Sequence, residues 1–448
     1  MAPPLGTRKA QDINISQFAF QLISLISPYL RIPFRSLPLF SFSLHSSDQY
    51  QVNFKKSLIT SSRINFTTTY QERMSPHSDA PSPPGSYIPF INMYRPTNSS
   101  SLRNASSVYS ESGSQFSRSF DSTSVSSIDS DDHVARPLVP GIYVPTVCFF
   151  DSESEDLDLE TTASHAVRLA KAGVAGLATQ GSNGEAVHLT HSERHTVTST
   201  TRRALREAGY SHLPIIVGCG AQSTRETIQY CREAYEAGGD YALVLPPSYY
   251  SPLFAPNSKS VLQFFTTVAD ASPIPLIIYN YPGAVGGMDL SSDTIIQLSK
   301  HENIVGVKLT CGNTGKLNRI VAATRSSTSS GNPSFIVLGG SADFLVQSLV
   351  GGGHGILAGL ANLAPKACIQ TMSAFQSGAI PEAQEMQEIL ARGDWAAIQG
   401  GVVSTKAGMQ GCLGYGGYAR SPLPRPTREE SERWKGMFSE LMKLEKNL

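Results

Sequence analysis

Short apolar runs alternate with longer segments of helical periodicity over most of this chain, and that alternation limits the possible folds more than any other feature. Eight runs suit buried strands, because they are rich in β-branched and aromatic residues and turn residues separate them. They are Gly141–Val147, Val174–Ala178, Pro214–Val217, Tyr241–Leu245, Leu276–Tyr279, Ile304–Lys308, Phe335–Leu338 and Gly355–Leu357. Intervening segments such as Ser192–Ala208 and Ser223–Ala237 have the length of crossover helices. The sequence therefore predicts an α/β fold.

Eight successive strand-then-helix units predict a (β/α)8 TIM barrel over residues 136–379. An open, doubly wound sheet is the alternative. That fold usually has fewer strands and a glycine-rich nucleotide-binding turn, and neither is evident here. Residues 380–448 follow the eighth unit and have mainly helical patterns. We expect them to form a C-terminal helical extension, an appendage to the barrel rather than a second catalytic domain.

The first 135 residues differ in composition from the rest of the chain. From Asn98 to Ser130 nearly half of the residues are serine, and a proline-rich stretch precedes them. Such segments bury too little apolar surface to offset the entropy lost on ordering, so we expect residues 1–135 to be disordered. Residues 1–70 carry seven Lys and Arg against two Asp, which is typical of an organellar transit peptide. The alternative is an over-extended gene model with translation starting near Met74, so the predicted location is cytoplasmic or mitochondrial.

Charge and cysteine usage exclude several classes of function. The formal net charge is zero and the basic residues form no patch with interleaved aromatics, which argues against nucleic-acid binding. Prolines and arginines interrupt the apolar stretch Phe18–Leu44, so we expect no membrane span. The six cysteines have neither a C-x-x-C pair nor a zinc spacing, which indicates reduced thiols in an intracellular protein. We expect no metal site and no cofactor.

Lys308 is the strongest candidate for a chemical role. It ends an apolar run that suits a buried strand, and a buried amine there is energetically costly unless it is used. A neutral lysine amine attacks carbonyl carbons, although a lysine in this position can also simply extend to solvent. Tyr279 ends the fifth predicted strand, and the loop Gly181–Glu185 follows the second. Because barrel enzymes carry their catalytic groups at the C-terminal ends of the strands, these three features would share one site.

The three features suit a lysine that forms an imine with a 2-oxo acid. The protonated imine withdraws electrons, so that a carbon–carbon bond can break. Tyr279 could carry the proton, although it could also only cap the core. Ser182 and Asn183, with the backbone N–H groups of their loop, could bind the substrate carboxylate. A glycine-flanked turn is weak evidence by itself.

Residues from Gly141 to Leu423 resemble the dihydrodipicolinate synthase / N-acetylneuraminate lyase family of Schiff-base, pyruvate-dependent aldolases. The matching segments occur in the order of the family: they are Gly141–Pro145, Gly181–Glu185, Leu189–Arg194, Val217–Gly220, Pro247–Tyr250, Tyr279–Pro282, Gly306–Lys308 and Gly339–Ser341. The resemblance implies that Lys308 forms the imine and that Tyr279 relays protons. It also implies that Ser182 and Asn183 bind the pyruvyl carboxylate and complete the relay.

The resemblance extends to Tyr249, Leu357 and the assembly. Tyr249 falls on the tyrosine that crosses a subunit interface into the catalytic site of a neighbour, with Tyr250 one position away. Leu357 lies near the backbone contact to substrate at the eighth strand. Such families most often form tetramers. The resemblance thus implies a homo-oligomer, a homotetramer, that acts on a small-molecule 2-oxo acid.

Two departures from the pattern of dihydrodipicolinate synthases narrow the range of activities that we expect for this chain. True dihydrodipicolinate synthases carry two threonines where this chain has Ser182 and Asn183, and an arginine where it has Ala284. That arginine anchors the carboxylate of the second substrate, and its loss would cost about 1.5–3 kcal/mol of binding. The sequence resembles instead the aldolases of 4-hydroxy-2-oxoglutarate and of 2-keto-3-deoxy sugar acids, and so does the stretch Gly416–Leu423. Dihydrodipicolinate synthase and a non-catalytic barrel that binds 2-oxo acids are the alternatives.

Overall fold

The computed structural model describes residues 41–44, 50–53, 136–254, 259–325 and 335–448. The chain divides into two units, Met1–Ser117 and Arg118–Leu448.

The described residues of the first unit form an antiparallel pair of strands, β1 (Ser41–Leu44) and β2 (Tyr50–Asn53), in which Ser41 pairs with Asn53. Both segments contain aromatic or aliphatic residues that favour strands. The pair falls within residues 1–135, the region that we expected to be disordered. The other residues of that region lie outside the described part of the chain, so for them disorder stays a prediction.

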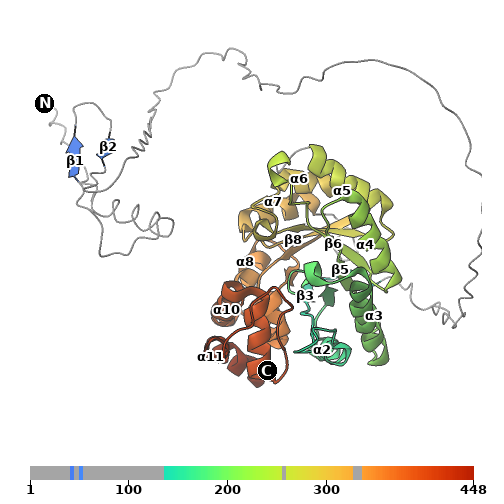
Figure 1. The fold of residues 1–448 in the computed structure, drawn as a ribbon, viewed down its shortest axis with the longest axis vertical. Coiled ribbons are helices and arrows are strands. Elements are labelled where there is room, and N and C mark those ends of the chain that lie inside the picture. The colour runs from blue at the N-terminus through green and yellow to red at the C-terminus, as the bar shows by residue number, and fades with distance from the viewer. Residues whose placement is uncertain (1–40, 45–49, 54–135, 255–258, 326–334) are drawn as a thin grey trace, which may run out of the picture. The chain divides into compact units, whose positions relative to one another are not determined.

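The second unit contains eight parallel strands that close into a barrel, with helices around it (Figure 1). The strands are β3 (Gly141–Pro145), β4 (Gly176–Thr179), β5 (Ile215–Gly218), β6 (Tyr241–Val244), β7 (Leu276–Asn280), β8 (Ile304–Leu309), β9 (Ile336–Gly339) and β10 (Gly355–Leu357). Each pairs with the next one along the chain, and β10 pairs with β3. The predicted (β/α)8 barrel is therefore confirmed.

Helices surround the barrel (Figure 1), of which the first seven connect successive strands and the eighth follows β10. They are α2 (Leu159–Lys171), α3 (His191–Glu207), α4 (Thr224–Glu236), α5 (Lys259–Ala271), α6 (Ser292–Leu298), α7 (Thr314–Thr324), α8 (Leu345–Val350) and α9 (Pro365–Gln376). The sequence specifies where α3 begins, because Thr190 accepts a hydrogen bond from the Glu193 backbone and the Glu193 side chain accepts one from Thr190. Such a capping box satisfies N–H groups that the first turn leaves free.

The strands are apolar on both faces because they separate two cores. Ile277 and Tyr279 of β7 pack in the barrel interior, whereas Leu276 and Ile278 pack against the surrounding helices. Side chains of a strand alternate between its faces, so every second residue belongs to the same core. This explains the continuous apolar runs of the sequence, which are typical of buried parallel sheets.

The barrel begins at Arg136, which lies at the end opposite the strand C-termini. Its guanidinium pairs with Asp240 at 2.9 Å and donates to the Ser211 carbonyl at 2.6 Å. Nearby, the Tyr143 hydroxyl donates to the Val139 carbonyl at 2.8 Å. These contacts attach the segment before β3 to the end of the barrel where the strands begin.

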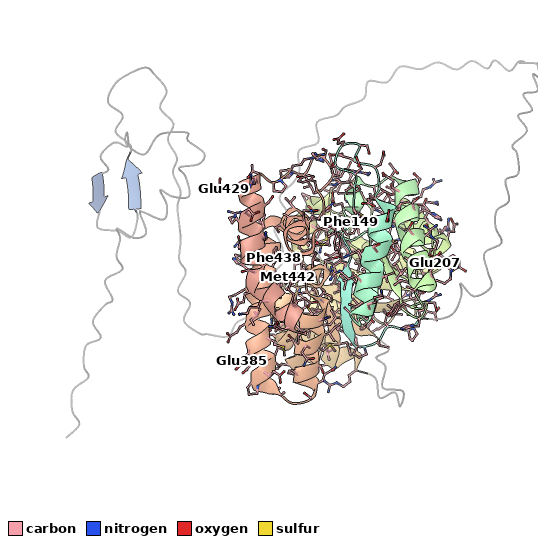
Figure 2. All side chains as sticks on the ribbon, turned by 90° about the horizontal axis from the view of Figure 1, so that it is seen from below. Phe149, Glu207, Glu385, Glu429, Phe438 and Met442 are labelled. Carbon is pink, nitrogen blue, oxygen red and sulfur yellow. The ribbon has the colours of Figure 1, made fainter. Side chains whose placement is uncertain are left out.

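The C-terminal extension is helical, as predicted, and comprises α10 (Ile380–Leu413), α11 (Arg428–Met437) and α12 (Ser439–Asn447). Gly401 interrupts α10 with non-helical dihedrals (φ 58°, ψ −139°). Phe438 and Met442 lie nearer the barrel than Glu385 and Glu429, which lie at the outer edge of these helices (Figure 2).

The extension shares its core with the barrel. Buried Phe438 and Met442 belong to the same apolar cluster as Leu363 and Ala364 at the end of the eighth unit. The extension is therefore integrated into the barrel more closely than the expected appendage. Among the described residues, no helix combines the length and the apolar character that crossing a bilayer requires.

Candidate active site

Lys308 and Tyr279 lie next to each other inside the barrel. They occupy paired positions on the neighbouring strands β8 and β7, and both side chains face the interior. Lys308 Nζ lies 4.2 Å from the centroid of the Tyr279 ring. The two residues are 4% and 3% exposed. Among the described residues Lys308 has no carboxylate partner, so its burial is not explained by an ion pair.

Tyr281 extends this arrangement and was missed at the sequence level. Its ring stacks on that of Tyr279, with centroids 5.7 Å apart and an interplanar angle of 20°. Burial raises the pKa of the Tyr281 hydroxyl, which keeps it protonated. The sequence could have indicated it, because Tyr281 directly follows β7, two positions after Tyr279, and side chains two apart in an extended segment share a face.

Thr310 is a second residue that the sequence analysis missed. It lies two positions after Lys308, and its hydroxyl is buried without a hydrogen-bond partner among the described residues. Gly340 lies so close that a Cβ there would overlap the Thr310 side chain. A buried hydroxyl without a partner is energetically unfavourable, so a ligand that bound it would relieve a cost already present in the fold.

The loop Gly181–Glu185 follows β4 at the same end of the barrel as Lys308. Ser182 is exposed and Asn183 is half-buried. Asn183 lies against Gly359, where a Cβ would overlap its side-chain nitrogen. Gly359 comes two residues after Leu357, which is buried in the same interior cluster as Tyr279. The structure thus brings Asn183 to the end of the strand that carries Leu357.

Glu185 ends this loop, and its carboxylate is fully buried. It accepts hydrogen bonds from Lys406 Nζ at 3.2 Å and from the Arg420 backbone at 2.9 Å. His188 Nδ1 lies 3.2 Å from the same carboxylate. With these partners Glu185 is a structural residue and not a free base at the mouth of the barrel.

Tyr249 is not part of this cluster within one chain. It is 78% exposed, and its ring contacts Tyr250 edge-on at 5.0 Å between centroids. Gln222 fixes the loop, because its side-chain oxygen accepts hydrogen bonds from the backbones of Ser248 and Tyr249 at 2.8 Å each. A role for Tyr249 in catalysis would therefore require a second copy of the chain.

Metal binding has no evident site here. Among the residues that the structure describes, no group of three or more His, Cys, Asp or Glu could hold a metal ion. The arrangement offers an amine, a phenol and polar loop groups instead. These groups suit covalent chemistry on a carbonyl compound.

Comparison with a family model and with known proteins agrees with a site for covalent chemistry on a carbonyl compound. The model of the dihydrodipicolinate synthetase family matches residues 139–440. The chain is 55% identical over 313 residues to a protein of Emericella nidulans named "Probable 4-hydroxy-2-oxoglutarate aldolase, mitochondrial", covering 70% of this chain and 98% of that protein. It is 49% identical over 328 residues to the L-threo-3-deoxy-hexylosonate aldolase of Aspergillus niger, with the same coverage.

A solved structure shares the fold and part of the sequence. It is a dihydrodipicolinate synthase family protein from Coccidioides immitis, with a TM-score of 0.62 and 32% identity. The match covers 70% of this chain and 99% of that one.

Proposed function

The chain belongs to the dihydrodipicolinate synthetase family, and from that premise we propose that it cleaves 4-hydroxy-2-oxoglutarate or a 2-keto-3-deoxy sugar acid through a Schiff base. It is a carbon–carbon lyase. The products would be pyruvate, or a related 2-oxo acid, and an aldehyde. The observation that carries this proposal is the buried Lys308 amine 4.2 Å from the centre of the Tyr279 ring.

The chemistry would begin at the Lys308 amine. The amine adds to C2 of the substrate, and water leaves to give a protonated imine. Tyr279 donates its phenolic proton to that departing water, and the resulting phenolate removes the proton of the C4 hydroxyl while the C3–C4 bond breaks. The electron pair of that bond moves into the imine, and the aldehyde departs. The resulting enamine takes up a proton at C3, and water hydrolyses the imine to release pyruvate and regenerate the amine.

Ser182 and Asn183 would bind the carboxylate next to C2. The loop that carries them lies at the end of the barrel where Lys308 and Tyr279 lie. The contact of Asn183 with Gly359 supports this role, since it directs the loop toward the strand that ends at Leu357. Leu357 would contribute through its backbone, because its side chain is buried in the core.

The identity of the substrate is supported by Ala284 and by the relatives. Ala284 ends the short 3-10 helix Pro282–Ala284 after β7 and is exposed. Its methyl group cannot pair with the carboxylate of an amino-semialdehyde, which argues against dihydrodipicolinate synthesis. Relatives at 55% and 49% identity carry the names of aldolases of 4-hydroxy-2-oxoglutarate and of L-threo-3-deoxy-hexylosonate.

We further infer that the enzyme is a homotetramer in which Tyr249 reaches the site of a neighbour. The support is the exposure of Tyr249 together with that of Tyr250 and Leu253, which belong to the same segment after β6. Large exposed apolar side chains that gather at one place commonly mark an interface. Sedimentation analysis of the full chain tests this assembly, and a monomer at micromolar concentration would contradict it.

We infer a mitochondrial location from two observations. The basic, serine-rich composition of residues 1–70 suits a transit peptide. The Emericella nidulans relative carries the word mitochondrial in its name. Fluorescent fusions of the full chain and of a chain that starts at Met74 would test this inference, since only the former should enter mitochondria.

Borohydride trapping with pyruvate tests the proposed function. Reduction should fix pyruvate covalently on Lys308, which peptide mass spectrometry would locate, and Lys308→Ala should remove the adduct and the cleavage activity. Folded wild-type protein without an adduct would contradict the proposal. Tight pyruvate binding without cleavage of either substrate class would favour the non-catalytic alternative.

A further inference from the structure

A buried ion pair connects the C-terminal extension to the loop that carries Ser182 and Asn183. Lys406, in the second half of α10, lies 3.2 Å from the carboxylate of Glu185, and the two side chains are 1% and 0% exposed. Removing one partner of such a pair leaves the other charge buried and alone, which is far more costly than losing a surface ion pair. The position of Glu185 therefore depends on Lys406.

The segment after α10 forms a second connection to the same loop. The Arg420 backbone donates to the Glu185 carboxylate at 2.9 Å, and its guanidinium donates to the His188 carbonyl at 2.8 Å. The guanidinium also pairs with Glu193 of α3 at 2.7 Å. Arg420 is thus anchored to the barrel on one side and to both ends of the turn Glu185–His188 on the other.

The loop has a backbone conformation that requires such support. Glu185 has left-handed dihedrals (φ 48°, ψ 39°), which are uncommon for a residue with a side chain. On its other side, Cys148 Sγ donates to the Gly184 carbonyl at 3.1 Å. Asn183 and Ser182 directly precede these two residues. Any displacement of Glu185 therefore moves the groups that would bind the substrate carboxylate.

We propose that Lys406 and Arg420 are positioning residues of the active site, which hold Ser182 and Asn183 in place through Glu185. Neither acts on the substrate directly. The proposal rests on the proposed function, because it assigns a distant support to the same carboxylate site. It predicts a selective defect in substrate binding when the ion pair is removed.

The test measures borohydride trapping of pyruvate by the full chain as a function of pyruvate concentration. Lys406→Met should raise the concentration for half-maximal labelling of Lys308 about tenfold or more, while labelling at saturation stays within about twofold of wild type. Turnover should show the same division, with a higher KM and a nearly unchanged kcat. Lys406→Arg keeps the charge and should recover most of the affinity.

A double variant and a matched control separate positioning from general stability. Glu185→Gln combined with Lys406→Met should bind pyruvate no worse than Lys406→Met alone, because both changes break one interaction. Glu445→Gln alters another buried residue of the extension, which caps α9 through the Lys366 and Ala367 backbones. Its half-maximal pyruvate concentration should match wild type.

Each outcome of these measurements either supports or contradicts the positioning role of Lys406 and Arg420. Folded Lys406→Met with wild-type pyruvate binding would overturn the proposal, and so would an equal defect in Glu445→Gln. If Lys406→Met does not fold, Arg420→Ala replaces it, with the same selective rise expected and an unchanged half-maximal concentration as the contrary result. If the wild-type protein itself is not labelled, the proposed function is contradicted, and the positioning proposal that rests on it is contradicted as well.

Discussion

At the scale of single residues, the amine and the phenol of the candidate site lie on strands, whereas the groups for the substrate carboxylate lie on a loop. Lys308 and Tyr279 are held by the pairing of β8 with β7, and Tyr281 continues the aromatic surface from the same side. Groups fixed by strand pairing keep their geometry more rigidly than groups on loops. The loop residues Ser182 and Asn183 lack that support, which is why they depend on contacts from other parts of the chain.

The hydroxyl of Tyr279 should matter for turnover and not for folding. Tyr279→Phe keeps the ring that contacts Lys308 and Tyr281 but cannot carry a proton. We expect kcat for aldol cleavage to fall about 10²- to 10⁴-fold, the usual contribution of a general acid–base, with little change in melting temperature. A coupled assay of released pyruvate measures kcat. Tyr281→Phe is the matched control, and an equal loss in both variants would contradict the assignment.

Thr310 should show opposite effects on stability and on binding. Thr310→Val removes a buried hydroxyl that has no partner among the described residues, so the free energy of unfolding should stay the same or rise. If substrate uses that hydroxyl, the half-maximal pyruvate concentration should rise by roughly three- to tenfold, as for one lost hydrogen bond. Urea unfolding and trapping titrations measure the two quantities. A clear loss of stability with normal binding would show that the hydroxyl is structural.

At the scale of elements, α10 is attached to the barrel by polar contacts that cannot be predicted from its sequence. The Asp394 carboxylate accepts hydrogen bonds from Ser341 Oγ at 2.6 Å and from the Ala342 and Asp343 backbones at 2.7 and 3.0 Å. These donors lie in the turn that follows β9. One helix of the extension thus fixes a loop at the catalytic end of the barrel and, through Lys406, a second one.

Asp394 should make stability depend on pH. Burial raises the pKa of its carboxyl from 3.8 to about 6, so the folded protein binds this proton more tightly than the unfolded chain. Its contribution to stability is therefore present at pH 4 and is lost as the pH rises toward and through 6, by about 3 kcal/mol at most. Asp394→Asn cannot ionise, and its unfolding free energy should decline less over this range.

Urea unfolding at several pH values between 4 and 7 measures the difference between wild type and Asp394→Asn. Asp343 lies nearby and burial also raises its pKa, so a smaller slope of the same sign should remain in the variant. Glu385→Gln, which alters an exposed carboxylate of the same helix, should parallel wild type. Parallel curves for Asp394→Asn as well would contradict the expected linkage.

At the scale of the whole molecule, the unit Arg118–Leu448 contains every residue of the candidate site. Its barrel begins with Arg136, whose guanidinium pairs with Asp240 beside Arg202. The extension then returns from the far end of the chain to the loops around the site. Barrel and extension should therefore unfold together.

Removal of residues 1–135 should leave the enzyme intact, whereas removal of Arg136 should not. A chain that starts at Arg136 keeps the pair with Asp240, so its melting temperature and kcat/KM should match those of the full chain. Arg136→Ala in that shorter chain should cost about 3 kcal/mol, the low end for a broken buried pair, because Asp240 keeps Arg202. Calorimetry measures the melting temperature and the loss of stability, and pyruvate release measures kcat/KM. Loss of activity on removing residues 1–135 would show that they contribute to the fold.

Much of this protein follows from local sequence pattern. Every barrel strand begins and ends within two residues of its expected bounds, because continuous apolar runs between turns specify buried parallel strands. Lys308 and Tyr279 could be identified because strand ends in a barrel meet at one place. The interruption at Gly401 was not predicted, since an isolated glycine in a helical pattern is commonly tolerated.

Only the tertiary structure decided which distant side chains meet. Lys406 and Glu185 are 221 residues apart, and Arg420 and Glu193 are 227 apart, so no periodicity or motif relates them. The overlap of Asn183 with any Cβ at Gly359 likewise exists only because the barrel closes β10 onto β3. Periodicity within a segment determines which elements form and which residues lie at their ends. The partners that support those residues are determined by how the closed barrel and its extension pack.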